Sequence, residues 1–168
     1  KFGTMDFYSQ LPSLTVITYL LMTFTQFFIV GPVEEMEFRG FLHDQQSRAM
    51  PQWAALIISS VLFGMSHIPI ALFVYKMTPY QLVVAEIGWM SAGAAFGAMY
   101  ILSRNLIACI VMHGIGNWVL SIFFFSSQLD PLGYTFTKDL YVGTATSVIN
   151  NALFIGIFYL FFKFYWRP

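Results

Sequence analysis

Long apolar stretches without charge alternate with short polar segments along the chain. A transmembrane helix needs about 20 predominantly apolar residues, and about five stretches of the chain come near that length. The predicted spans cover approximately residues 11–30, 52–67, 80–102, 106–125 and 142–165. The pattern therefore predicts an all-α fold, a polytopic transmembrane helix bundle that forms a single integral membrane domain over residues 1–168.

Prolines and polar residues mark the predicted ends of these spans. The Gly31-Pro32 pair is expected to interrupt the first apolar helix, after which a renewed helix carries residues 34–48 out of the membrane. Pro69 is expected to close the second span and to leave residues 68–80 as a loop. The remaining predicted connections are the polar segments 103–105 and 126–141.

Composition supports a membrane location. The chain is 58% hydrophobic and 10% charged, whereas soluble domains carry roughly 25% charged residues. Eight basic and eight acidic residues balance each other, so nothing indicates a nucleic-acid partner. We expect a multi-pass integral membrane protein surrounded by lipids, in the cytoplasmic membrane if its source is a prokaryote. The chain starts at Lys1 without an initiator methionine, and we expect further amino-terminal spans in the complete protein.

Several polar groups interrupt the apolar runs, and ionisable groups at membrane depth are costly and rarely idle. At about 1.5 Å of rise per residue, Glu34 and His113 lie roughly 13 and 11 Å below the side where the renewed helix leaves the membrane. Asn117 and His67 lie about 17 and 22 Å below it. Different helices therefore bring a carboxylate, two imidazoles and an amide to similar levels. Glu86 comes out nearer the opposite face and does not join this group.

Spacing separates the roles of these groups. Glu35 and Arg39 are four residues apart and can form a charge pair along one helix face. Glu34 points about 100° away from Glu35 and remains available as a general base beside an imidazole. His113 and Asn117 lie one turn apart and can donate two hydrogen bonds to one oxygen, as an oxyanion hole requires. Together these positions predict a polar active site.

Other interpretations remain open. Each polar residue alone is more typical of helix packing, so a membrane scaffold or immunity protein without catalytic activity is one alternative. The chain contains no HExxH motif, and its aspartates lie outside the predicted spans. A zinc ion bound by Glu34, His67 and His113 is the second alternative, because these residue types are zinc ligands.

Three motifs together resemble a known family. They are, in chain order, Glu34-Glu35-x-x-x-Arg39, Phe63-x-x-x-His67 and His113-x-x-x-Asn117. This set is similar to the CPBP family of CAAX proteases and bacteriocin-processing proteins, which includes the type II CAAX prenyl endopeptidases and the Abi proteins. The resemblance covers about residues 30–120, which would form the catalytic core.

The resemblance implies a glutamate-dependent intramembrane endopeptidase that needs no cofactor and commonly has about eight helical spans. Its substrate would be a prenylated CAAX protein or a peptide precursor. Glu34 would activate water with the assistance of His67, and His113 with Asn117 would stabilise the oxyanion. The architecture of the site would be supported by Glu35 and Arg39.

Overall fold

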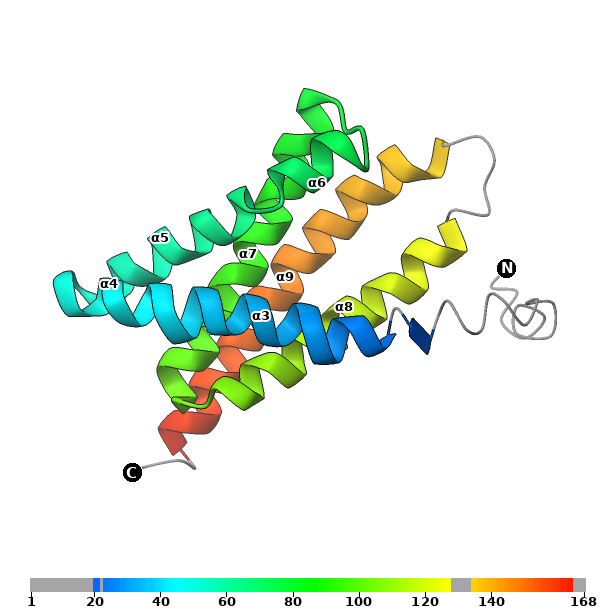
Figure 1. Cartoon of the computed structure of the whole chain (residues 1–168). Helices are drawn as coiled ribbons and strands as arrows, with labels where there is room; N and C mark the ends of the chain where they lie inside the picture. Colours follow the sequence, from blue (N-terminus) through cyan, green and yellow to red (C-terminus); the bar gives the residue numbers. More distant parts are fainter. Residues whose placement is uncertain (1–19, 22, 128–133, 165–168) are drawn as a thin grey trace.

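A computed structural model describes residues 20–21, 23–127 and 134–164. Within these ranges it describes the side chains of all residues except 118–143 and 146. Every regular element in these ranges is a helix, which confirms the predicted all-α fold (Figure 1). In chain order the elements are η1 (Gln26–Val30), α3 (Gly31–Glu35), η2 (Met36–His43), α4 (Asp44–Ala49), α5 (Gln52–Met65), α6 (Ile68–Phe73), α7 (Pro79–Ser103), α8 (Leu106–Ser127) and α9 (Tyr134–Phe164).

The elements from η1 to α4 form one continuous helical rod, drawn from blue to cyan in Figure 1. The predicted interruption at Gly31-Pro32 is therefore wrong. Gly31 keeps helical angles (φ −54°, ψ −53°) and donates its N–H to the carbonyl of Gln26, five residues earlier. This wider π-helical pairing precedes Pro32, which has no N–H to donate and normally clashes with the preceding turn. The helix therefore continues through Pro32, because its hydrogen bonding changes locally to the wider π-helical pairing.

Among the described residues, three helical stretches are long and apolar enough to cross a membrane: Gln52–Phe73, Pro79–Ser103 and Ser147–Phe164. The predicted third span is confirmed by α7, which begins with a capping box between Thr78 and Gln81. The predicted span at 106–125 is helical as α8. Half of the predicted first span, 11–30, lies outside the described residues.

Two predicted connections are shorter than expected. Pro69 does not close the second span; it lies in the first turn of α6, where its missing N–H costs no hydrogen bond. The loop predicted at 68–80 is thereby reduced to the residues between α6 and α7. In the same way, α9 begins at Tyr134, so the carboxy-terminal part of the polar connection predicted at 126–141 is helical.

The core of the bundle lies around α7, which packs against α5 and α9, while the rod contacts α5, α7 and α8. Two glycines allow the close approach of rod and α8. A Cβ atom at Gly31 would lie 3.2 Å from the carbonyl oxygen of Ile110, and one at Gly114 would lie 2.6 Å from the Phe27 ring. Because neither position carries a side chain, the carboxylates of the rod can reach α8.

Candidate active site

The rod contributes a fully buried charge pair. Nη1 of Arg39 donates a hydrogen bond to Oε1 of Glu35 at 2.9 Å, so the pair expected from the i, i+4 spacing forms. Nη2 of Arg39 donates to the carbonyl oxygen of Gly93 in α7, also at 2.9 Å. The guanidinium carbon lies 4.6 Å from the centroid of the Phe63 ring of α5. The pair therefore ties the rod to α7 and α5, and we call it the brace.

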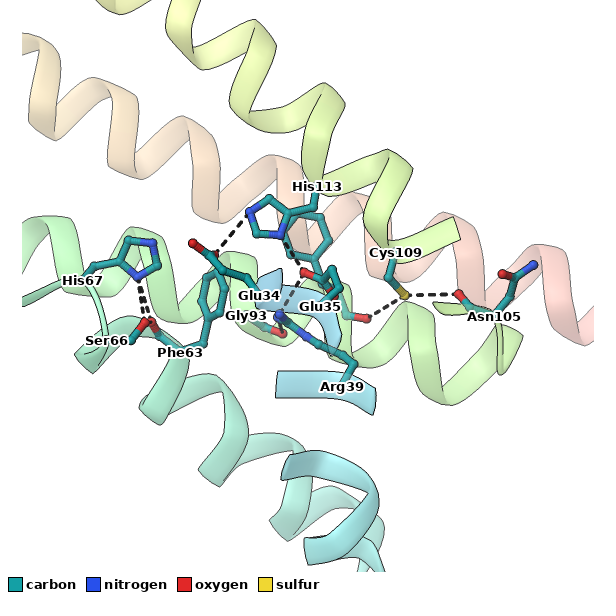
Figure 2. A network of polar contacts seen from close by, with 11 residues as sticks. Glu34, Glu35, Arg39, Phe63, Ser66, His67, Gly93, Asn105, Cys109 and His113 are labelled. Atoms are coloured by element: carbon teal, nitrogen blue, oxygen red, sulfur yellow. Dashed lines mark hydrogen bonds and ion pairs between the residues drawn. The ribbon is translucent and has the colours of Figure 1, made fainter. Parts of the chain in front are cut away.

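His113 of α8 extends the brace. Its Nδ1 lies 2.6 Å from Oε1 of Glu35. An ionised carboxylate only accepts hydrogen bonds. Nδ1 therefore carries a hydrogen and donates a hydrogen bond to Glu35. The imidazole is 2% exposed and stacks on the Phe96 ring of α7, with centroids 4.9 Å apart. These contacts fix the ring and direct Nε2 toward Glu34 (Figure 2).

The two adjacent glutamates have different environments. Oε2 of Glu34 lies 3.6 Å from Nε2 of His113, and the Glu34 side chain is 25% exposed. Glu35 is completely buried. In Figure 2 the Glu34 carboxylate points from the rod toward the side on which His67 lies. Adjacent positions on the rod thus give one fully buried and one partly exposed side chain, and Oε2 of Glu34 is itself buried without a hydrogen-bond partner among the described residues.

His67 lies in the turn between α5 and α6, and its hydrogen bonds define its tautomer. Ser66 donates its hydroxyl hydrogen to the carbonyl oxygen of Phe63 at 2.7 Å, and Nδ1 of His67 lies 2.8 Å from the same oxygen. Since a carbonyl oxygen only accepts, Nδ1 carries the proton. The neutral ring therefore has its lone pair on Nε2. Trp89 of α7 stacks on the ring with centroids 4.9 Å apart.

The Phe63 ring lies among the polar groups of the site. Its centroid is 5.0 Å from that of His67 and 5.9 Å from that of His113. Both imidazoles therefore border one phenylalanine ring, which also contacts the Arg39 guanidinium. The Phe63 ring thus places His67, His113 and Arg39 in a single region.

Asn117 is oriented by a residue that the sequence analysis missed. Its Nδ2 donates a hydrogen bond to Oε1 of Gln26 in η1 at 2.8 Å. The signal that could have identified Gln26 is a carboxamide within an otherwise uncharged apolar run. The structure thus adds a second contact between rod and α8, two turns before Glu34.

The part of the chain that the structure describes contains no group of three or more His, Cys, Asp or Glu side chains placed to hold a metal ion. The side chains of the site are of types that can transfer protons. They offer a partly exposed glutamate, an imidazole lone pair and hydrogen-bond donors from α8. The brace supports them from the buried side.

Comparison with known proteins gives one match. The family model described as type II CAAX prenyl endopeptidase Rce1-like matches residues 16–119. That range contains the rod, α5, α6, α7 and the part of α8 that carries His113 and Asn117. No curated protein and no solved structure matches the chain.

Proposed function

We propose that this chain, which belongs to the family of Rce1-like type II CAAX prenyl endopeptidases, hydrolyses a peptide bond within the membrane without a metal ion. The substrate is a prenylated CAAX protein or a peptide precursor. The chain is an integral membrane protein, and we propose a multi-pass topology, in the cytoplasmic membrane if its source is a prokaryote. The observation that carries the proposal is the contrast between Glu35, buried in the brace, and the partly exposed Glu34.

Glu34 is the proposed general base, assisted by His67. The partial exposure of Glu34 supports this role, because water can reach the side chain. The tautomer of His67 supports the assistance, since its Nε2 lone pair can accept a hydrogen bond from the same water. A base in this position typically accelerates hydrolysis by roughly 10²- to 10⁴-fold.

His113 and Asn117 are the proposed donors to the oxyanion. Nδ1 of His113 already donates to Glu35, so a second proton on Nε2 makes the ring a donor toward the reacting carbonyl. The hydrogen bond that Nδ2 of Asn117 donates to Oε1 of Gln26 holds the Asn117 carboxamide in one orientation.

In the proposed reaction, Glu34 takes one proton from water as the water oxygen bonds to the scissile carbonyl carbon. The carbonyl oxygen becomes the oxyanion and is stabilised by donors from α8. The intermediate then collapses: the C=O bond re-forms, the C–N bond breaks, and Glu34 returns its proton to the leaving nitrogen. The enzyme thereby regains its starting state at Glu34.

The test uses the purified full chain in bilayer nanodiscs with fluorescence-quenched peptides that end in a CAAX sequence, either farnesylated or not, and with unlipidated leader peptides. Cleavage of one class, located by mass spectrometry, supports the proposal. If every peptide stays intact, the chain is instead a scaffold or immunity protein. Loss of cleavage with phenanthroline that added zinc restores would establish the zinc alternative and refute the metal-free mechanism.

A further inference from the structure

Glu86 in α7 is a buried carboxylate that the proposed reaction does not use. It is 9% exposed, and neither of its oxygens has a hydrogen-bond partner among the described residues. Burying a carboxylate without a partner destabilises a fold, because the lost hydration is not replaced. A glutamine of nearly the same shape would lower this cost, because it carries no charge. The position of Glu86 therefore requires a physical reason.

The packing of α7 on α5 places Glu86 one turn from the stacked pair of Trp89 and His67. A Cβ atom at Gly64 of α5 would lie 2.9 Å from Oε2 of Glu86, so the absence of a side chain at Gly64 makes room for the carboxylate. Trp89 follows Glu86 by three residues in α7 and stacks on His67, which lies in the turn three residues after Gly64. Glu86 and Trp89 therefore lie on one face of α7, opposite the segment from Gly64 to His67.

We propose that Glu86 is a positioning residue that acts through His67, by stabilising the positive charge that this imidazole acquires during hydrolysis. The proposal rests on the proposed function. Water carries two protons: the first travels through Glu34 to the leaving nitrogen. The second leaves the new carboxylic acid product and binds to Nε2 of His67, which becomes an imidazolium. The product is then a carboxylate, and the imidazolium returns its proton to solvent before the next cycle.

The negative charge of Glu86 favours this proton transfer through the apolar interior, where charges interact more strongly than in water. Its unpaired burial is then a stability cost that serves turnover, as at other functional sites. A residue that costs stability and supports turnover can be distinguished by experiment from one that only packs. If Glu86 served packing alone, Glu86→Gln would lower stability and activity together. The proposal instead expects Glu86→Gln to raise stability and to lower turnover.

The experiment compares Glu86→Gln with wild type in the full chain, using whichever quenched peptide wild type cleaves. Glu37→Gln is the matched control, because Glu37 is an exposed glutamate on the rod. We expect kcat of Glu86→Gln to fall about tenfold, part of the factor that proton transfer contributes, with KM unchanged. We expect its Tm to rise by about 2–4 °C. The control should leave both values unchanged.

Each result decides one point. Wild-type kcat in Glu86→Gln would overturn the inference, and so would a fall in kcat accompanied by a lower Tm or failure to fold. In a His67→Gln background, Glu86→Gln should cause no further loss of turnover; a further tenfold loss would show that Glu86 does not act through His67. If wild type cleaves no peptide of the panel, the proposed function fails and the inference fails with it. An active wild type with an equally active Glu86→Gln refutes the inference alone.

Discussion

Removing Arg39 should destabilise the whole bundle. The guanidinium is 1% exposed, and it is bonded to Glu35 within the rod and to the Gly93 carbonyl oxygen of α7. Arg39→Ala leaves the fully buried Glu35 with His113 as its remaining hydrogen-bond partner. Breaking a buried ion pair from one side costs about 3–5 kcal/mol. At about 2–4 °C per kcal/mol for a chain of this size, Tm falls by about 6–20 °C.

The assay is thermal unfolding of the purified variants in one detergent, followed by circular dichroism. Arg48→Ala is the control, since Arg48 pairs with Asp44 at the same i, i+4 spacing and 2.8 Å, but its side chain is 70% exposed. An exposed pair contributes little, so this control should unfold within about 2 °C of wild type. The double variant Arg39→Ala with Glu35→Gln should recover part of the loss, because it removes the unpaired charge. Equal Tm values for Arg39→Ala and the control would refute the brace.

Two further predictions concern the rod. Gln26→Met removes the acceptor that orients Asn117 and should lower kcat about tenfold without changing Tm. The control Gln45→Met, at an exposed position, should change neither kcat nor Tm. A Gln26→Met enzyme with wild-type kcat would show that Asn117 needs no such partner. His43, at the membrane exit, has its pKa lowered below the ordinary 6.5 by burial, and Arg104 adds to the effect. Because the unfolded chain binds this proton more readily, the contribution of His43 to stability is present above about pH 6.5 and is lost as pH falls through that value. Tm should therefore fall on acidification from about pH 7.5 to about pH 5.5, and fall less in His43→Leu; identical pH dependence in both proteins would contradict the assignment.

Features encoded by local spacing could be predicted from the sequence. The brace between Glu35 and Arg39 follows from an i, i+4 interval, which any helix brings to one face. The limits of α7 follow from local residues as well. Thr78 caps its start, and its end lies at the polar segment 103–105 that was predicted as a turn, where Arg104 is left-handed (φ 51°). Apolar runs of helix length give the membrane spans for the same reason. None of these depends on the rest of the fold.

Features that depend on tertiary contacts could not be predicted. The hydrogen bond from His113 to Glu35 joins residues 78 positions apart, and that from Asn117 to Gln26 joins residues 91 positions apart. No spacing encodes such pairs, so Glu35 was expected to pair with Arg39 alone. The continuous helix at Pro32 likewise depends on π-helical pairing, which no local residue pattern predicts.

Glu86 shows how a correct estimate can be misread. In the sequence analysis, the rise per residue gave the depth of each residue below the side where the renewed helix leaves the membrane. It placed Glu86 near the opposite face, and it placed His67 deeper than the other site residues. The two therefore lie at comparable levels, but comparison with Glu34 and His113 alone hid this. The structure brings the helix positions together through Gly64, which has no side chain to separate α5 from α7.

The central claim is that Glu34 activates the water. The most direct test is the initial cleavage rate of Glu34→Gln, measured beside Glu37→Gln on a peptide that wild type cleaves, with Tm recorded for all three proteins. The account predicts a loss of roughly 10²- to 10⁴-fold for Glu34→Gln with an unchanged Tm, and a wild-type rate for Glu37→Gln. Equal cleavage rates for wild type and Glu34→Gln would contradict it.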